Sequence, residues 1–299
     1  MKQRVRKPVF RYHGGKWRVA PWIIRHFPPH GLYVEPFGGA ASVLLRKSPA
    51  KIEVLNDIYG RVVSCYRVLR DPVLAEKVMR LLRFTPCSEL EYRGCLDQVD
   101  DPVEDARRML VIGRQAHGST VVAGGKKTGW RRGSINRSAA GMVRENDWGA
   151  IWQHVLDWAD RLRDVYLESK PAVEVIRRWD CADALFYVDP PYLFSTRATR
   201  PEGYAHELDD AGHRELAGVL RECAGMVVIS GYPSDLYDLE LYADWQRVQC
   251  AAMADHGKHS TEVLWINPAA VRKMEECLQQ KTSGIQMQMW VSAGVSCGG

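Results

Sequence analysis

The sequence predicts an α/β fold, a doubly wound and mainly parallel sheet interrupted by a mainly helical insert. Strand patterns alternate with helix patterns in two separate stretches of the 299-residue chain, as in parallel sheets covered by helices. Between these stretches, residues 72–162 show helical patterns without strands. Apolar residues make up 46% of the chain, enough for a packed core, so we do not expect a chain that is disordered throughout.

The first stretch has the order of elements found in a nucleotide-binding half of a doubly wound sheet. An apolar strand is broken by two glycines, and a second strand ends at an acid. A strand is expected over residues 32–37, a glycine turn over 38–39 and a helix over 40–47. A second strand over 51–55, with its acidic end at 56–57, is followed by a helix over 58–69.

The insert and the second stretch are predicted from the same periodicities. Helices are expected over 72–83, 101–113 and 148–162. In the second stretch, strands are expected over 165–167, 184–189 and 226–230, and helices over 172–179 and 209–223. The stretch is expected to end in an antiparallel hairpin formed by 245–251 and 261–267. After Pro268 we expect one helical stretch and a mobile tail rich in glycine, serine and glutamine.

Asp189-Pro190-Pro191-Tyr192 comes at the end of the apolar strand 184–189. Proline has no N–H to donate, so two prolines end the ladder and the chain leaves the sheet there. In open α/β sheets, ligands bind in the crevice at the carboxyl ends of the strands. We therefore expect Asp189 and Tyr192 at a ligand site, although the four residues alone are equally compatible with a rigid turn.

A glycine turn follows the first strand in Glu35-Pro36-Phe37-Gly38-Gly39-Ala40, and Asp57 lies at the end of the next strand. Small residues let a ligand approach the backbone closely. An acid at the end of the second strand is the usual partner of ribose hydroxyls, so the pattern indicates a nucleoside-containing cofactor. Neither G-x-G-x-x-G nor G-x-x-x-x-G-K-[ST] occurs, which disfavours NAD and a P-loop.

A third motif precedes the first helix, where Tyr12 is followed by Gly14-Gly15-Lys16. Two glycines and a lysine at the junction of a loop and a helix suit an anionic group. A cofactor carboxylate would serve as that group, and a solvated basic turn is the alternative.

In chain order, these motifs resemble those of the Dam-type, alpha-group DNA adenine-N6 methyltransferases. The resemblance covers about residues 9–268, and residues 261–267 are similar to the family's last strand. It implies a Rossmann-like S-adenosylmethionine-dependent methyltransferase sheet with a terminal antiparallel hairpin. The implied division is 1–75 (cofactor-binding part of the catalytic domain), 76–163 (target-recognition insert), 164–269 (second part of the catalytic domain) and 270–299 (C-terminal extension). The residues that carry the resemblance are Tyr12, Gly14, Gly15, Lys16, Glu35, Pro36, Phe37, Gly39, Asn56, Asp57 and the tetrapeptide 189–192.

The resemblance also implies roles for the motif residues. Asp189 and the Pro190 carbonyl would accept the two N–H groups of the adenine amino nitrogen, with Pro191 stiffening the turn. Tyr192 would stack on the base, which must first be flipped out of the duplex. S-adenosylmethionine would lie against Tyr12, Gly14, Gly15, Lys16, Glu35, Pro36, Phe37, Gly38, Gly39, Ala40, Asp57 and Asp189, with Lys16 near its carboxylate and Asp57 on its ribose. One departure is Ala41, at a position where the family often has a second glycine.

The segment 114–137 is basic, contains no Asp or Glu, and is too long for an ordinary connection. Cations contact phosphates, arginine reads guanine edges, and an aromatic side chain can wedge into the base stack. Double-stranded DNA is therefore the expected partner, with a solvated flexible loop as the alternative. The expected DNA-binding residues are Arg114, Lys126, Lys127, Trp130, Arg131, Arg132 and Arg137.

Several alternatives stay open at this point. N4-cytosine methylation uses a similar tetrapeptide, although its first residue is more often Ser than Asp. An RNA adenine methyltransferase and a DNA-binding regulator without catalysis are two further readings. A solitary enzyme and one paired with a restriction endonuclease look alike, and a homodimer through residues 270–299 or the helices of 72–113 is neither required nor excluded.

The remaining composition is uninformative about partners. A net charge of +5 does not by itself indicate nucleic acid. None of the eight cysteines forms a C-x-x-C pair, so we expect reduced thiols and no metal. No stretch of about 20 apolar residues occurs, which disfavours a membrane protein and favours the cytoplasm.

Overall fold

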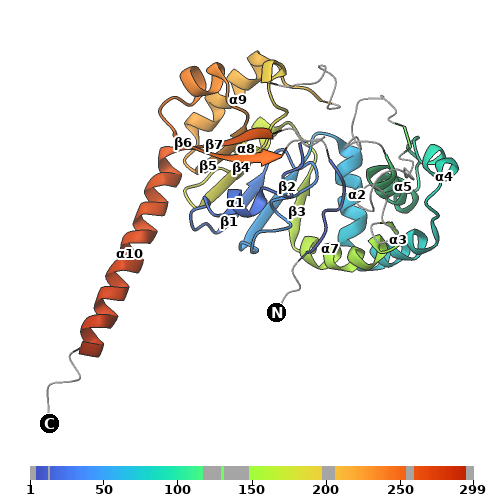
Figure 1. Cartoon of the computed structure of the whole chain (residues 1–299), viewed down its shortest axis with the longest axis horizontal. Coiled ribbons are helices and arrows are strands. Elements are labelled where there is room, and N and C mark those ends of the chain that lie inside the picture. The colour runs from blue at the N-terminus through green and yellow to red at the C-terminus, as the bar shows by residue number, and fades with distance from the viewer. Residues whose placement is uncertain are drawn as a thin grey trace, which may run out of the picture.

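A computed structural model describes residues 5–12, 14–116, 129–130, 148–196, 206–253 and 259–293. Seven strands form one sheet in the order β3-β2-β1-β4-β5-β7-β6 (Figure 1). Their bounds are β1 Leu32–Glu35, β2 Ile52–Asn56, β3 Val165–Glu168, β4 Ala184–Val188, β5 Met226–Gly231, β6 Gln246–Met253 and β7 His259–Ile266. Strands β1 to β5 pair in parallel, and β7 and β6 are antiparallel. The predicted Rossmann-like sheet with a terminal antiparallel hairpin is therefore confirmed.

The central strands β1, β4 and β5 are buried on both faces. Successive side chains of a strand point to opposite sides of the sheet. Tyr33 of β1 and Tyr187 of β4 belong to one buried cluster, whereas Val34 and Phe186 belong to the other. This explains why the parallel strands read as continuous apolar runs in the sequence instead of alternating with polar residues.

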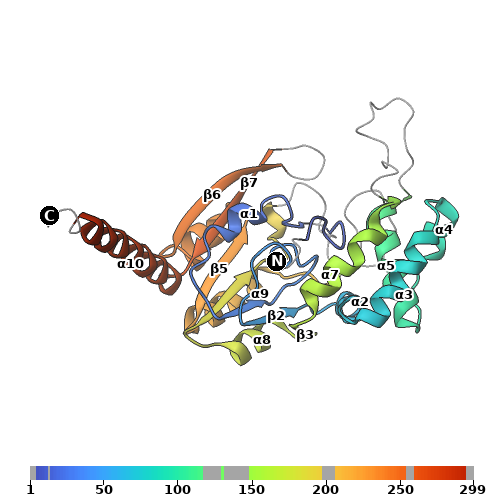
Figure 2. The same cartoon turned by 90° about the horizontal axis from the view of Figure 1, so that it is seen from below.

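Helices cover the two faces of the sheet differently (Figures 1 and 2). The cluster on one face includes residues of α8 (Ala172–Trp179), α9 (Asp210–Glu222) and the π-helical turn η3 (Leu236–Leu241). The cluster on the other face includes residues of α1 (Ala20–Ile24), α2 (Gly60–Arg70) and α7 (Val155–Leu162).

The helical part of the chain shares one buried cluster with the sheet. It comprises α3 (Pro72–Phe84), α4 (Glu89–Gly94), α5 (Pro102–Gln115) and the short helix η1 (Ile151–His154). Asp-Pro pairs begin α3 and α5, where the Asp side chain caps the first backbone N–H groups and the proline occupies the first turn.

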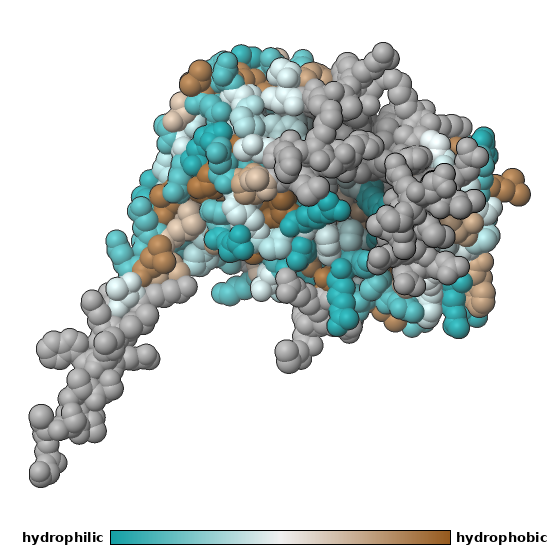
Figure 3. All heavy atoms as spheres, viewed as in Figure 1, coloured by the Kyte–Doolittle hydropathy of each residue, from teal (hydrophilic) through white to brown (hydrophobic). Residues whose placement is uncertain are grey.

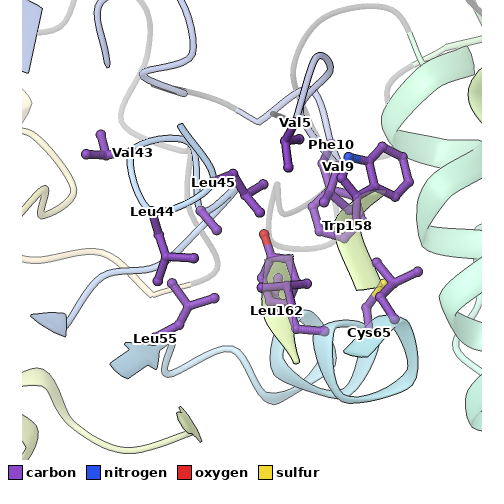
Figure 4. Close-up of a cluster of buried hydrophobic side chains, with 14 of the residues drawn as sticks. Val5, Val9, Phe10, Val43, Leu44, Leu45, Leu55, Cys65, Trp158 and Leu162 are labelled. Atoms are coloured by element: carbon purple, nitrogen blue, oxygen red, sulfur yellow. The ribbon is translucent and has the colours of Figure 1, made fainter. Parts of the chain in front are cut away.

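The N-terminal segment belongs to the same buried cluster as the sheet and the helical part. Figure 4 shows Val5, Val9 and Phe10 beside Trp158 of α7. Trp158 is fully buried, and its Nε1 donates a hydrogen bond of 2.9 Å to the carbonyl of Lys7. Residues that precede the first strand are therefore built into the core next to the helical part.

The predicted helix over 40–47 is wrong, because these residues form consecutive turns. Ala41 has a φ of 50°, outside the helical region. The N–H of Leu44 donates to Glu35 Oε1 at 2.6 Å instead of to a carbonyl one helical turn earlier. A tertiary hydrogen bond thus replaces the helical ladder at this position.

Three further elements differ from the sequence prediction. The helix α4 and the π-helical turn η3 were not expected. The helix after Pro268 is longer than expected, because α10 extends over Pro268–Ala293 and projects from the body of the molecule in both ribbon views (Figures 1 and 2). Within the described ranges, no helix combines the length and apolar character needed to cross a membrane. Hydrophilic and hydrophobic residues are interspersed on the coloured part of the surface in Figure 3.

Candidate functional site

A cavity of about 270 Å³ lies at the carboxyl ends of the parallel strands, with residues that follow β1, β2, β3 and β4 in its walls. This is the edge at which open α/β sheets bind ligands. The cavity brings together all twelve residues expected to contact the cofactor, which are Tyr12, Gly14, Gly15, Lys16, Glu35, Pro36, Phe37, Gly38, Gly39, Ala40, Asp57 and Asp189.

Glu35, the last residue of β1, is a buried carboxyl group in this wall. Its Oε1 accepts hydrogen bonds of 2.6 Å from the Tyr33 hydroxyl and from the Leu44 N–H. Burial raises the pKa of Glu35 to about 8, against the opposing effect of these hydrogen bonds. The group therefore carries a proton over much of the neutral range unless a positive charge is brought beside it.

The glycine turn lies against the end of β2 and is held by Asp57. Asp57 Oδ2 accepts from the Gly39 N–H at 2.8 Å, and its Oδ1 accepts from the Tyr59 N–H at 2.8 Å. Gly39 has a φ of 44°, which favours glycine. A Cβ on Gly38 would lie 2.8 Å from the backbone carbonyl oxygen of Asn56, so close packing favours glycine there.

Asn56 has a structural role in this arrangement. Its side chain is fully buried, donates to the Pro36 carbonyl at 2.8 Å and to the Lys170 carbonyl at 3.0 Å, and accepts from the Lys170 N–H at 2.9 Å. One amide thus ties together the loops that follow β1 and β3, which both line the cavity.

The tetrapeptide 189–192 follows β4 at the same edge of the sheet. Asp189 and Pro191 line the cavity, whereas Pro190 and Tyr192 are not part of its lining. Asp189 Oδ1 accepts a hydrogen bond of 2.9 Å from the hydroxyl of Ser230, at the end of β5. It also forms an ion pair of 3.0 Å with the ammonium group of Lys16, which is 5% exposed.

Tyr192 belongs to a polar cluster next to the cavity. Its hydroxyl donates to Glu262 Oε1, and the Lys16 ammonium lies 4.5 Å from the centroid of its ring. Tyr232 packs edge-on against the same ring at 4.7 Å. Sequence motifs indicated Lys16 and Tyr192 separately, and the strand order brings them together with Glu262. The sequence analysis had placed Glu262 in the expected last strand without a role in the site.

Ala41 occupies the position at which the sequence departs from the family pattern. Its φ of 50° lies in the left-handed region, which costs a residue with a side chain roughly 1–2 kcal/mol. The family's frequent glycine at this position is thereby explained. The methyl group is fully buried, and its packing offsets part of that strain.

Sequence analysis missed the far walls of the cavity. These walls come from the loop after β3, from residues just before α9 and from α9 itself. The end of β3 could have indicated the first wall, because it lies at the same sheet edge. The missed residues are Ser42, Val43, Ile58, Tyr59, Lys170, Pro171, Ala172, Val173, Tyr187, His206, Glu207, Leu208, Gly212, Glu215 and Leu216.

Arg114 does not lie on an exposed surface as its predicted contact with DNA requires. It is 6% exposed and its guanidinium donates to the carbonyls of Pro8 and Val9, so it fastens the N-terminal segment to α5. Trp130 is partly buried against the core and donates to Gln115 Oε1 at 3.3 Å. The other predicted DNA-binding residues, Lys126, Lys127, Arg131, Arg132 and Arg137, lie outside the described residues.

Cysteine and metal chemistry add nothing to this site. Seven cysteines lie within the described ranges, and all seven are free thiols. In the same ranges, no group of three or more His, Cys, Asp or Glu side chains is arranged to hold a metal ion.

Comparison with known proteins gives the same assignment as the motifs. The family model of the D12 class N6 adenine-specific DNA methyltransferases matches residues 12–92. The chain is 24% identical over 191 residues to the DNA adenine methylase of Escherichia coli K12 and, to the same extent, to that of Escherichia coli O157:H7. The aligned part covers 62% of this chain and 65% of each relative, which is less than two thirds of their length. On this evidence the chain is related to the D12 class N6 adenine-specific DNA methyltransferases.

Proposed function

We propose that the protein transfers a methyl group from S-adenosylmethionine to N6 of a flipped-out adenine in duplex DNA. One observation carries the proposal: Asp189 of the tetrapeptide lies in the same cavity as Glu35, Gly39 and Asp57 of the predicted cofactor site. Asp189 is separated from the other three by the whole helical insert, and the parallel sheet brings all four to one edge. The family match and the names of the relatives support the same reaction.

The chemistry of the cavity fits S-adenosylmethionine, a cation at its sulfonium and ammonium groups. Five carboxyl groups line the cavity against two lysines, Lys16 and Lys170. The carboxyl residues are Glu35, Asp57, Asp189, Glu207 and Glu215. This excess of acid favours a positively charged ligand, since charge complementarity favours binding.

Ser42 provides a second sign of a polar ligand. Its side chain lines the cavity and is 6% exposed, and its hydroxyl has no hydrogen-bond partner among the described residues. Buried polar groups are normally hydrogen-bonded, so an unpartnered hydroxyl in a cavity wall suits a polar group of the ligand.

The chain's own residues then have distinct tasks. S-adenosylmethionine supplies the electrophilic methyl group when bound. Asp57, just after β2, would hold ribose hydroxyls. Asp189 would accept one N–H of the adenine amino group and the Pro190 carbonyl the other, which localises the nitrogen lone pair for attack. Positioning of this kind supplies much of a catalytic effect.

We also propose that residues 76–163 form the target-recognition insert, with the cations of 126–137 on the DNA phosphates. Its described helices α3 and α5 pack on α2, which belongs to the buried cluster on one face of the cavity-bearing sheet, and this supports the placement. Duplex DNA as the substrate would place the enzyme in the cytoplasm. A solitary enzyme is the simpler form of the proposal, and neither a restriction partner nor a homodimer is needed for it.

Adenine is favoured over the rival bases by two observations. Asp189 stands at the first position of the tetrapeptide, and both the family description and the relatives' names specify adenine in DNA. Against the non-catalytic regulator, the Asp189 carboxylate reaches the cavity and is fixed by Ser230 and Lys16.

The test is methyl transfer to DNA by the purified wild type and by Asp189→Ala. Each protein is incubated with labelled S-adenosylmethionine and unmethylated duplex DNA, and the DNA is digested to nucleosides. Label is expected in N6-methyladenosine with the wild type and not with Asp189→Ala. Asp183→Ala, which removes an exposed carboxylate just before the opposite end of β4, is the matched control and should keep its activity.

The other outcomes separate the alternatives. Label in N4-methylcytosine would move the assignment to cytosine. Label in RNA but not in duplex DNA would point to the RNA reaction. Binding of S-adenosylmethionine without label in either nucleic acid would contradict the enzyme assignment and favour a binding-only role.

A further inference from the structure

Glu262 is a buried carboxylate in the segment 261–267, and the sequence analysis gave it no role in the site. It lies on β7 and is 5% exposed. Because β7 runs antiparallel to β5, with Val263 opposite Gly231, Glu262 lies one residue beyond the end of β5. The terminal hairpin thereby brings an acid to the sheet edge that carries the tetrapeptide.

The side chain of Glu262 contacts two groups of the proposed active site. Its Oε1 accepts the hydrogen bond from the Tyr192 hydroxyl and lies 3.7 Å from the Lys16 ammonium. The same ammonium is 3.0 Å from Asp189 Oδ1 and 4.5 Å from the centre of the Tyr192 ring. Two carboxylates, one ammonium and one phenol thus form a closed cluster.

A buried carboxylate is costly unless it is paired and hydrogen-bonded. Desolvation raises the pKa of Glu262, and the Lys16 ammonium opposes that rise. Replacing Glu262 by an apolar residue of similar volume would avoid this cost, so stability alone does not account for an acid here. Its two partners instead assign it a role in holding the aromatic ring and the lysine.

We propose that Glu262 is a positioning residue for the methyl transfer, because it fixes the Tyr192 hydroxyl and the Lys16 ammonium next to Asp189. The inference rests on the proposed function. Tyr232 packs edge-on against the Tyr192 ring, and the Lys16 ammonium lies over the same ring. The bond to Glu262 holds the hydroxyl end of the ring on which the target base would stack, while the shared ammonium holds the Asp189 carboxylate in place.

The test compares steady-state methylation by the wild type, Glu262→Gln and Tyr192→Phe. Glu262→Gln keeps the size of the side chain but loses its charge, and Tyr192→Phe keeps the ring but loses its anchor. We expect each to lower kcat by roughly tenfold or more, since misplacement by about 1 Å can cost about 10²-fold. The KM for S-adenosylmethionine should stay within about twofold in Tyr192→Phe, because Tyr192 does not line the cavity. The double variant should lose little more than either single variant.

Asp238→Asn is the matched control. Asp238 accepts a hydrogen bond of 3.0 Å from the indole of Trp265, which lies on the same strand as Glu262. This variant makes the same change of carboxylate to amide and disturbs β7, but it leaves the cluster around Tyr192 intact. Its kcat should equal that of the wild type even if its melting temperature falls.

The outcomes separate this inference from the proposed function. If the wild type transfers no methyl group to DNA, the proposed function fails and the inference falls with it. If the wild type is active and Glu262→Gln matches its kcat, or loses activity only in proportion to its folded fraction, the inference alone is overturned. If Glu262→Gln does not fold, Tyr192→Phe decides, and an unchanged kcat in that variant also overturns it.

Discussion

Glu35 shows how one buried residue links the backbone to the chemistry of the cavity. Its carboxyl group organises the turns over 40–47 through the Leu44 N–H, and it also lines the cavity. Burial raises its pKa to about 8. The folded state therefore binds a proton that the unfolded state has already released at neutral pH, and this difference makes stability depend on pH.

The direction of this pH dependence follows from the two pKa values of Glu35, 4.5 in the unfolded chain and about 8 in the folded protein. The stabilising contribution is complete below about pH 4.5 and is lost as the pH rises to about 8. Glu35→Gln keeps Oε1 as an acceptor and has no proton to lose. We expect the free energy of unfolding of the wild type, relative to Glu35→Gln, to fall between pH 5 and pH 8 in urea titrations. A difference that stays constant over this range would contradict the raised pKa.

At the scale of elements, α7 is joined to the cavity by Arg161. Its guanidinium donates to Glu53 Oε2 on β2 at 2.5 Å and to the Leu44 carbonyl at 2.6 Å. The N–H of Leu44 in turn donates to Glu35. Lys47 completes the network with a bond of 2.7 Å to Glu53 Oε1. The last helix of the insert thus supports the turn that forms a wall of the cavity.

Arg161→Met should show the strength of this support. Breaking a buried ion pair leaves an uncompensated charge, and we expect a loss of about 3 kcal/mol because Lys47 still pairs with Glu53. S-adenosylmethionine should also bind more weakly, since the turn that bears Ser42 and Val43 loses an anchor. Arg163→Ala, which removes an exposed pair with Asp160, should cost under about 1 kcal/mol. Urea unfolding and calorimetric titration measure both effects, and equal losses in the two variants would refute the role of Arg161.

Sequence reasoning succeeded at this scale where local pattern decides the element. The range of α8 was predicted to the residue, and the strands were found because apolar runs between turn residues identify them. The prediction for 40–47 failed because the acceptor for Leu44 comes from a side chain on another element. Glu262 was missed because its partners are fixed only by the order of strands, which no local pattern contains.

At the scale of the whole molecule, the proposed contact of the basic segment 114–137 with DNA can be tested. Lys126 and Lys127 lie in the basic segment whose role is proposed from sequence. If both contact phosphates, Lys126→Ala/Lys127→Ala should reduce the slope of log K against log salt by about 1.8, at roughly 0.9 per contact. Arg177→Ala/Arg178→Ala removes two exposed cations from α8 and should leave the slope unchanged.

Fluorescence anisotropy of labelled duplex DNA at several salt concentrations measures this slope. Binding of S-adenosylmethionine should be the same in both double variants, since none of the four residues lines the cavity. Equal slopes for the two double variants would remove Lys126 and Lys127 from the DNA interface. Arg114 shows why such tests are needed, because its charge suggested DNA and its environment shows a buried contact with backbone carbonyls.

The projecting helix α10 has a consequence for how the protein moves through a solvent. A helix of 26 residues is about 39 Å long at 1.5 Å per residue. Such an arm on a 33.9 kDa chain increases frictional drag much more than it increases mass. A monomer should therefore elute ahead of spherical standards of the same mass and imitate a larger species. The number of subunits should be determined by light scattering or sedimentation equilibrium, because the mass measured by these methods does not depend on the shape of the molecule.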